Sequence, residues 1–596
     1  MKAVDLNARP AQWLQEPPAM AQALHDGSVI WEDVDDNGDS WLLRSTTAGR
    51  TDDVLSGIRP GSNLYGYGGG AWLMKGRQIV YVDKATQQLF ASRPDGVTTA
   101  LTRAAPPGSV HLGDLACGHP GRAEVMAVRH LPASGRSQII SVDTTGRGET
   151  ILVDREACLA WPTASPDGHR LAWVEWLPPD MPWDRSRLMI LDTRDGIMRS
   201  VLAEEEAVSD PLWSREHGLT ATTDRTGWWL RWSVPFDGTD PHPLIVARTD
   251  MAMPRWSAGQ RSAATVDGGT AVVHGASTSR LGLIASGAGN LTPLGPSNLI
   301  WQPYLHASGR YLAGIAGSEE SGWDVAVLDL RSARLRMVGR RAPQTALPAA
   351  EVHRFHSDGR SVECILNTPN GHGPFPAVVF AHSGPTAHAQ VVRDREVDAL
   401  LTHGIAVIRV NYTGSSGYGR DFRHALYGQW GRADVQDCIR AVDHLARLGR
   451  VDGQHVAIRG KSAGGWTAMH AAATDRFRAA VAYYGVSDAH LLSTTTHPFE
   501  RGYVRRLAFD GKDHWFASPL QTVDAVKCPV LLVQGDEDQV VPIEQAQMYA
   551  QALWRRQRDC RLLILPGEGH GIRAHAAREL AIQAETDLYQ RMLLQS

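Results

Sequence analysis

The stretch that decides the fold reads Val456-Ala-Ile-Arg-Gly460-Lys461-Ser462-Ala463-Gly464-Gly465-Trp466. Its apolar start predicts a strand, and the run that follows it, Thr467 to Ala473, predicts a helix. Small residues around the serine allow a sharp strand-to-helix turn, so the hydroxyl of Ser462 is pushed out of the sheet. The backbone N–H of Ala463 then points into the same space, as half of an oxyanion hole. This pattern makes Ser462 a candidate nucleophile.

A nucleotide-binding loop is the competing interpretation, because Gly460-Lys461-Ser462 also ends such loops. That loop needs a further glycine five residues before its last one, where the backbone wraps around phosphate. His455 occupies that position, and the residues after it are typical of a strand. The sequence therefore disfavours phosphate binding.

Composition places the chain among water-soluble proteins without an affinity for nucleic acid. Its 596 residues are 43% hydrophobic and 21% charged, with a formal net charge of -4. This length predicts two or more domains, and the net charge shows no excess of basic residues that would bind nucleic acid. We find neither a signal-like N-terminus nor a membrane-spanning run, and the six cysteines show no paired spacing. We expect a cytoplasmic protein with no cofactor, metal or membrane partner, and a homo-oligomer stays open.

The first part of the chain, residues 1–345, has the rhythm of short strands and turns. Turn signals such as Ser165-Pro-Asp-Gly168 and Ser308-Gly309 precede alternating apolar stretches. They recur about every 45 to 50 residues, the size of a four-stranded propeller blade. We therefore predict an all-β propeller of about seven blades, in preference to an array of β-sandwiches.

Residues 346–596 have a different rhythm, in which apolar strands alternate with longer helical patterns. Near-continuous apolar strands separated by helices predict a mostly parallel, doubly wound sheet, as in α/β-hydrolases. The predicted strands are Ala377–Ala381, Ile405–Val410, Val456–Ile458, Ala479–Tyr483, Val530–Val533 and Leu562–Leu565, with a helix near 434–448.

A nucleophilic serine needs a base and an acid, which follow it in this fold on loops after later strands. His570 stands between glycines directly after the last predicted strand and is the candidate base. The acid lies in the loop after the preceding strand, where spacing alone does not choose among Asp536, Glu537 and Asp538.

The second oxyanion donor should come from the loop after an early strand, Ala381-His382-Ser383-Gly384-Pro385. We expect a backbone N–H of Ser383 or Gly384 to face the substrate carbonyl, with the His382 side chain as the alternative donor.

Several motifs together resemble the prolyl oligopeptidase family of serine peptidases. They are Gly460-Lys-Ser-Ala-Gly-Gly465, Gly535-Asp-Glu-Asp538-Gln-Val-Val-Pro542, Gly569-His570-Gly571, Asn411-Tyr-Thr-Gly414-Ser-Ser-Gly417-Tyr-Gly419 and Trp430-Gly-Arg-Ala-Asp434-Val-Gln-Asp437. The resemblance covers residues 350–590. It implies Ser462 as nucleophile, Asp538 as acid and His570 as base, with a propeller that covers the site.

The N-terminal half resembles the acylaminoacyl-peptidase and aminopeptidase branch, through Tyr67-Gly-Gly-Gly-Ala-Trp72, Met181-Pro-Trp-Asp184 and Asp224-Arg-Thr-Gly-Trp-Trp229. Dipeptidyl-peptidase relatives hold the substrate's α-ammonium with a glutamate pair, which suggests Glu204, Glu205 and Glu206 here, although three loop glutamates are also typical of a solvated run. Val486, Phe499 and Tyr503 are weaker candidates for the pocket beside the scissile bond.

The chain departs from the family pattern at two positions. It has Ser383 where His-Gly-Gly-Pro is usual, and Gly66 where many relatives have Glu. The first change affects the oxyanion loop, and the second puts recognition of a free amine in doubt.

The resemblance implies a serine peptidase that cleaves short peptides through an acyl-enzyme, as an exopeptidase releasing an N-terminal residue, acyl-residue or dipeptide. One alternative is an amidase or esterase dedicated to a peptide-like natural product. A non-catalytic propeller scaffold is a further alternative, which the ordered Ser, Asp and His disfavour.

Overall fold

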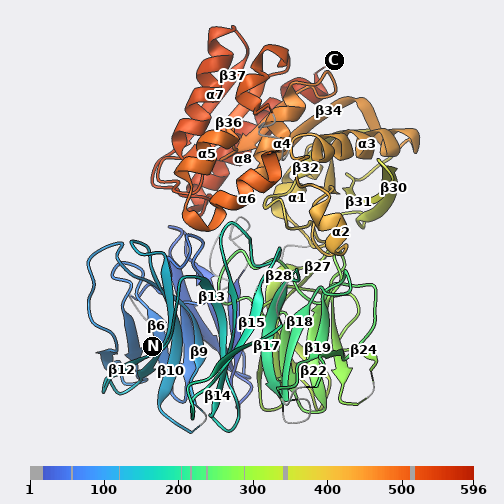
Figure 1. Ribbon diagram of the computed structural model, residues 1–596. Coiled ribbons are helices and arrows are strands. Elements are labelled where there is room, and N and C mark those ends of the chain that lie inside the picture. Colours follow the sequence, from blue (N-terminus) through green and yellow to red (C-terminus); the bar gives the residue numbers. More distant parts are fainter. Residues whose placement is uncertain are drawn as a thin grey trace.

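The computed structural model describes residues 18–54, 58–119, 121–202, 205–214, 218–236, 239–287, 289–339, 347–509 and 517–595. These residues form a β-propeller with an α/β domain seated on one end of it (Figure 1).

The propeller consists of seven antiparallel sheets, each built from consecutive strands, which confirms the predicted repeat. Six sheets have four strands and the last has five. The first four blades are β1 Ala19–Ala23, β2 Val29–Val34, β3 Ser40–Ser45, β4 Thr51–Asp53; β5 Trp72–Lys75, β6 Gln78–Val82, β7 Leu89–Ser92, β8 Thr98–Ala100; β9 His111–Cys117, β10 Glu124–Leu131, β11 Arg136–Asp143, β12 Glu149–Arg155; and β13 Cys158–Ala164, β14 Arg170–Trp176, β15 Arg187–Asp192, β16 Met198–Leu202. The other three are β17 Val208–Ser214, β18 Gly218–Thr223, β19 Leu230–Ser233, β20 His242–Pro243; β21 Ala263–Val266, β22 Gly269–His274, β23 Arg280–Ala285, β24 Leu291–Pro293; and β25 Ile300–Trp301, β26 His306–Ser308, β27 Tyr311–Ser318, β28 Gly322–Asp329, β29 Arg334–Met337.

Apolar side chains between neighbouring blades hold the propeller together. Val80 and Leu89 of the second blade, for example, pack in one buried cluster with Val125 and Ile140 of the third. The alternating pattern of each strand supplies such a row to both faces of its sheet. The ring closes where β1 lies beside β26 and β27 of the last blade.

The α/β domain contains an eight-stranded sheet in the order β30-β31-β33-β32-β34-β35-β36-β37. Two pairs at one edge, β30–β31 and β31–β33, are antiparallel. All other neighbouring strands pair parallel, so the sheet is mostly parallel as predicted. Its strands are β30 Glu351–Ser357, β31 Arg360–Asn367, β32 Phe375–Ala381, β33 Ala406–Asn411, β34 Val451–Lys461, β35 Ala480–Tyr483, β36 Val530–Gly535 and β37 Cys560–Leu565. Its helices are α1 Arg395–Thr402, α2 Arg420–His424, α3 Ala433–Arg447, α4 Ala463–Ala472, α5 Ala489–Thr495, α6 Pro498–Ala508, α7 Ile543–Arg555 and α8 His575–Tyr589, with short helical turns at Pro519–Gln521, Val523–Ala525 and Gln590–Leu594.

The last propeller strand ends at Met337 and the first strand of the α/β sheet begins at Glu351. The predicted domain division, 1–345 and 346–596, falls between these strands. It stays a prediction, because residues 340–346 lie outside the described ranges.

A buried ion pair joins the two domains. The Arg423 guanidinium of α2 lies 2.5 Å from the Asp224 carboxylate of the propeller, and both side chains are fully buried. The same guanidinium stacks over the Trp229 ring, 4.2 Å from its centroid. Figure 1 shows α2, α5 and α6 on the side of the α/β domain that faces the propeller. Together with the pairs of Arg506 on α6 with Asp180 and Asp184 of the propeller, this buried pair holds the propeller against these helices.

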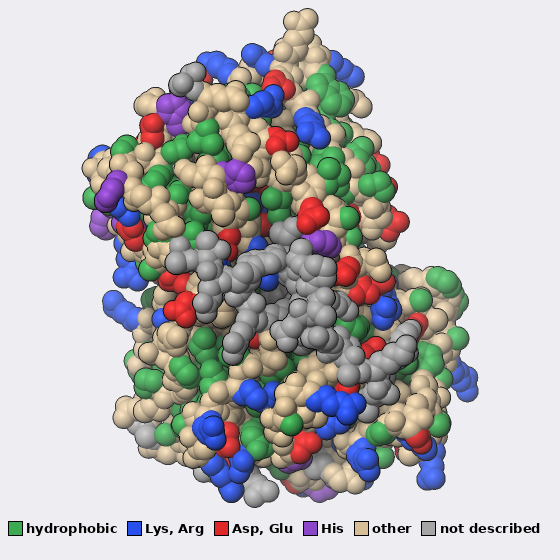
Figure 2. Space-filling model, turned by 180° about the vertical axis from the view of Figure 1, so that it is seen from behind, with side chains coloured by type: hydrophobic (Ala, Val, Ile, Leu, Met, Phe, Trp, Pro, Cys, Tyr) green, Lys and Arg blue, Asp and Glu red, His purple; other side chains and the backbone are tan. Residues whose placement is uncertain are grey.

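The surface carries charges of both signs, mixed over both domains in the view of Figure 2. This pattern agrees with the small net charge of -4. Among the helices that the structure describes, none combines the length and apolar character needed to cross a bilayer.

We expect Asp224→Asn to destabilise the protein by about 3–5 kcal/mol, because it leaves the buried Arg423 charge without its partner. Denaturant unfolding followed by tryptophan fluorescence measures the change. The matched control is Asp358→Asn, whose pair with Arg440 is half exposed and should cost less than about 1 kcal/mol. Equal stability of the two variants would contradict the role of the buried pair.

Candidate active site

Ser462 occupies a strained turn between β34 and α4. Its backbone angles are φ 53° and ψ -116°, in a region that residues with a side chain rarely adopt. The turn is held from both sides, because the Ser462 N–H donates to the Tyr483 carbonyl at 2.9 Å and its own carbonyl accepts from Gly465 N–H at 2.8 Å. The sequence-predicted turn is therefore present, with the serine at its tip.

Two glycines make this turn sterically feasible. A Cβ at Gly460 would lie 1.9 Å from the Gly464 carbonyl oxygen, and one at Gly464 would lie 2.2 Å from the Ala381 carbonyl oxygen. The second distance also shows that the loop after β32 lies directly against the serine turn. The Gly-x-Ser-x-Gly pattern thus brings the nucleophile and the oxyanion loop together.

The structure brings His570 and Asp538 to Ser462 in one hydrogen-bonded chain. Ser462 Oγ lies 3.0 Å from His570 Nε2, and His570 Nδ1 lies 2.8 Å from Asp538 Oδ2. The Asp538 side chain is fully buried, whereas the His570 side chain is 14% exposed. This is the geometry in which an imidazole accepts a proton from serine while a carboxylate holds its other nitrogen.

The structure shows which of the three candidate carboxylates contacts His570, a choice that spacing alone could not make. The other oxygen of Asp538, Oδ1, accepts from the backbone N–H groups of Val540 and Val541, both at 2.9 Å. Asp536 is exposed and accepts from Gly567 N–H, and Glu537 is also exposed. Only Asp538 of the three points inward to the imidazole, in agreement with the family resemblance.

The His382 side chain braces the predicted oxyanion loop. Its Nδ1–H donates to the Ser383 carbonyl at 2.9 Å, its Nε2 lies 2.7 Å from Ser415 Oγ, and its ring stacks on Tyr412. Burial lowers the pKa of His382 to about 3, so the ring is neutral. Both ring nitrogens are thus engaged, one with Ser383 of the loop and one with Ser415 after β33, which favours a backbone N–H of Ser383 or Gly384 as the donor. Ala463 is the first residue of α4, so its N–H has no partner within the helix.

The three glutamates proposed for the amine have different surroundings. Glu204 lies outside the described residues, and Glu205 is exposed. Glu206 is buried, and its carboxylate forms an ion pair with Arg225 at 2.8 Å and a hydrogen bond with Thr223. Glu206 is thus already neutralised by a cation of its own domain.

Val486, Phe499 and Tyr503 all belong to one buried apolar cluster that spans both domains, and Phe499 and Tyr503 lie on α6. Phe499 stacks on Tyr65 with ring centroids 5.8 Å apart, and Tyr503 meets Trp183 edge to face at 5.6 Å. The rings of Tyr67, Trp176, Trp256 and His497, which the sequence did not single out as pocket residues, pack in the same place.

Glu500, between the two predicted aromatic residues, was also missed. It is buried, and the Tyr67 hydroxyl donates to its Oε2 at 2.9 Å. A signal was present in the sequence: Glu500 belongs to the same helical stripe as Tyr503, Val504 and Leu507, which are buried. A carboxylate in an apolar stripe needs a reason to be there.

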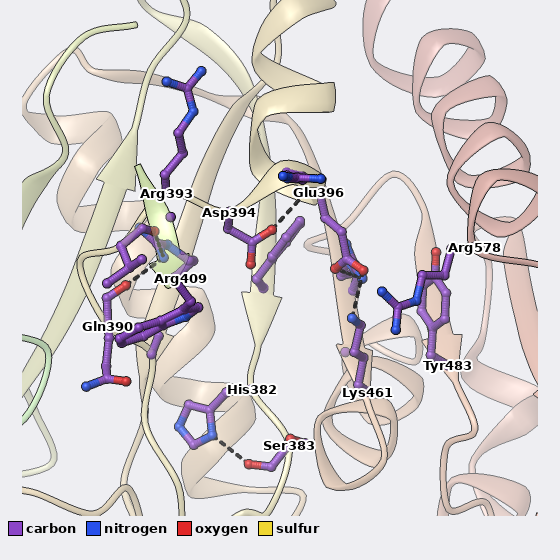
Figure 3. A pocket seen from close by; sticks show the side chains of 18 of the residues that line it. His382, Ser383, Gln390, Arg393, Asp394, Glu396, Arg409, Lys461, Tyr483 and Arg578 are labelled. Atoms are coloured by element: carbon purple, nitrogen blue, oxygen red, sulfur yellow. Dashed lines mark hydrogen bonds and ion pairs between the residues drawn. The ribbon is translucent and has the colours of Figure 1, made fainter. Parts of the chain in front are cut away.

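A cavity of about 440 Å³ lies beside the oxyanion loop (Figure 3). Its lining includes His382, Ser383 and Tyr484 from the α/β domain, and Gln302 and Trp323 from the propeller. The Tyr484 ring packs 4.8 Å from the His570 ring, so the cavity borders the Ser462 site.

Lys461, which precedes the serine, points toward Glu396 in this cavity at 2.8 Å (Figure 3). Burial opposes the charge on Lys461, but Glu396 beside it raises the lysine pKa, so the ammonium is engaged there. Within the part of the chain that is described, no cluster of His, Cys, Asp or Glu could hold a metal ion.

The site therefore consists of a serine at a strained strand-to-helix turn, a histidine that contacts it and a buried carboxylate that contacts the histidine. This arrangement on a mostly parallel sheet places the protein among α/β-hydrolases with a serine nucleophile, here with a propeller as second domain.

The model of the Prolyl oligopeptidase family matches residues 392–596. Over 97% of the chain, the fold is similar to that of a puromycin-hydrolyzing peptidase from Mycobacterium tuberculosis, with 31% identity, a TM-score of 0.91 and 94% of that chain covered. A puromycin hydrolase is similar at 30% identity, a TM-score of 0.90 and coverage of 97% and 95%. The chain therefore belongs to the prolyl oligopeptidase family.

Among curated relatives, an acylamino-acid-releasing enzyme from Arabidopsis thaliana is 26% identical over 386 residues, 61% of this chain and 46% of that protein. Acylamino-acid-releasing enzyme 2 from Oryza sativa subsp. japonica is 30% identical over 233 residues, 36% of this chain and 30% of that protein. The chain thus spans less than half the length of these relatives.

We expect Gly464→Ala to slow the reaction of Ser462 with a fluorophosphonate probe by about 100-fold, because the new Cβ displaces the oxyanion loop by the order of an ångström. The second-order labelling rate measures the effect, with intrinsic fluorescence as the check on folding. The control is Gly148→Ala, where an added Cβ meets no atom within 4 Å. Unchanged labelling of a folded Gly464→Ala protein would contradict the close approach of the two loops.

Proposed function

We propose that this protein is a serine peptidase that hydrolyses amide bonds of short peptides through an acyl-enzyme, as an exopeptidase. The observation that carries the proposal is the chain from Ser462 Oγ to His570 Nε2 at 3.0 Å and from His570 Nδ1 to Asp538 Oδ2 at 2.8 Å. Family membership supports the same chemistry.

In the proposed reaction, Ser462 Oγ attacks the substrate carbonyl while His570 Nε2 takes the hydroxyl proton. Asp538 accepts the Nδ1–H bond and so fixes the tautomer that leaves Nε2 free to act as base. The Ala463 N–H and an N–H of Ser383 or Gly384 stabilise the oxyanion. His570 then donates its proton to the leaving amine, and water releases the acyl group by the same steps in reverse.

The position of the propeller supports a restriction to short substrates. A propeller residue contacts the chain directly after the oxyanion loop: the Trp256 indole N–H donates to the Thr386 carbonyl at 2.9 Å. The adjoining cavity of about 440 Å³ is of the size that binds small ligands. A site walled in this way suits the release of an N-terminal residue, acyl-residue or dipeptide.

An amidase acting on one peptide-like natural product is the second candidate. It is favoured by the similarity over 97% of the chain to proteins described as hydrolysing puromycin. Puromycin belongs in the substrate panel for this reason. A cytoplasmic location and a homo-oligomeric state stay predictions.

The test is hydrolysis of a panel of aminoacyl, N-acyl-aminoacyl and dipeptidyl anilides together with puromycin. Ser462→Ala should abolish both turnover and fluorophosphonate labelling, and Asp538→Asn should lower kcat by about 10⁴-fold because it favours the wrong tautomer. Asp536→Asn, in the same loop but exposed, is the control and should retain activity.

Turnover of puromycin alone would favour the dedicated amidase. A folded wild-type protein that neither labels nor turns over any substrate would support the non-catalytic scaffold and overturn the proposal.

A further inference from the structure

Glu500 is a buried carboxylate at the boundary between the domains. It lies in the first turn of α6, on the side of the α/β domain that faces the propeller (Figure 1). Its side chain is 11% exposed. The Tyr67 hydroxyl, from the propeller, donates to Oε2 at 2.9 Å, and the Thr496 hydroxyl lies 3.5 Å from the same oxygen. Both domains therefore shape its surroundings.

Within the part of the chain that is described, the carboxylate lacks the cation that normally accompanies a buried acid. Among the described residues, no lysine or arginine forms an ion pair with Glu500, and Oε1 accepts no hydrogen bond. The nearest basic group is His497, with Nε2 3.7 Å from Oε2. Burial and the nearby His570 charge lower the pKa of His497 to about 4, so this imidazole is neutral near pH 7.

Other buried acids of this protein show what is missing at Glu500. Glu206 has Arg225 at 2.8 Å, and Asp224 has Arg423 at 2.5 Å. Burial raises the pKa of the Glu500 carboxyl, against the opposing effect of a positive His570, so its charged form is poorly compensated by the described residues. A cation supplied from outside would complete this site.

The carboxylate also lies within electrostatic range of the triad. The charges of His570 and Asp538 both act on it, and His570 acts on its neighbour His497 as well. Aromatic rings surround this position: Tyr67 lies 5.1 Å from His497, 5.5 Å from Trp256 and 6.3 Å from Phe499, between ring centroids. A carboxylate in an aromatic setting, on which the charge of the His570 imidazole acts, fits a small organic cation.

We propose that Glu500 binds the free α-ammonium at the N-terminus of the substrate, with Tyr67 orienting the carboxylate, and that the protein therefore acts on unacylated substrates. The inference rests on the proposed peptidase function and assigns its substrate class. An ammonium forms charge-assisted hydrogen bonds with Glu500, whereas an acylated or absent amine leaves the buried carboxylate uncompensated. The amine-binding group then comes from α6, rather than from the propeller glutamates Glu205 and Glu206.

The experiment compares three anilides that differ only in the amine: phenylalanine p-nitroanilide, its N-acetyl derivative and the deamino analogue 3-phenylpropionyl p-nitroanilide. Glu500→Gln keeps the shape of the side chain and removes its charge. We expect kcat/KM for the free-amine substrate to fall roughly 10- to 150-fold, and that for the deamino analogue to change by less than about threefold. Glu544→Gln, which removes an exposed carboxylate of α7, is the control and should leave all three values unchanged.

Three outcomes would overturn the assignment: wild-type protein that prefers the acetylated anilide, Glu500→Gln that slows all anilides equally, or Glu500→Gln that slows none. Fluorophosphonate labelling of Ser462 separates this failure from failure of the proposed function. Normal labelling of Glu500→Gln shows that the variant is folded and that its catalytic group is intact. A wild-type protein without labelling or turnover would instead reject the peptidase function itself.

Discussion

The strained backbone of Ser462 is the constraint on which the catalytic arrangement depends. A residue at φ 53° between a strand and a helix persists only if its surroundings hold it there. Tyr483 and Gly465 do so through backbone hydrogen bonds, and Gly460 and Gly464 leave room for the turn and for the loop that crosses it. The serine hydroxyl, the Ala463 N–H and the oxyanion loop consequently share one small space.

The site is a property of both domains together. Thr386, at the end of the oxyanion loop, is bonded to Trp256 of the propeller and to Tyr503 of α6. The same helix carries Glu500, whose carboxylate accepts from the propeller residue Tyr67. The buried Arg423–Asp224 pair joins the same two domains and contributes to the packing that these contacts require. Chemistry comes from the α/β domain, and we infer that selection among substrates arises where the propeller meets α6.

Sequence patterns predicted those features that depend on local order along the chain. The period of the turns gave the seven blades, and the apolar runs gave the six strands from Ala377 to Leu565 that frame the site. Ser462 and His570 could be placed because each follows a recognisable strand at a turn rich in glycine. The choice of Asp538 over Asp536 could not be made by spacing, since it depends on how the backbone of Val540 and Val541 curls around one carboxylate.

Side-chain contacts between segments that are distant in the chain could not be predicted from the sequence. Glu206 and Glu500 are equally acidic in the sequence, yet Arg225 neutralises the first while the second faces Tyr67, 433 residues away along the chain. The helical stripe of α6 could have indicated that Glu500 is buried. Only the packing of the two domains shows that it lies within range of the His570 charge and that no described Lys or Arg forms an ion pair with it. Long-range electrostatic pairing of this kind leaves no local pattern.

The central claim is that Ser462 forms a covalent acyl-enzyme. Intact-protein mass spectrometry of samples quenched during turnover of a phenylalanine p-nitrophenyl ester tests it most directly. We expect a transient mass increase equal to one phenylalanyl group, located on the peptide that contains Ser462 and lost on further incubation. Ester turnover without any adduct in the wild type, or an adduct that persists in Ser462→Ala, would contradict it.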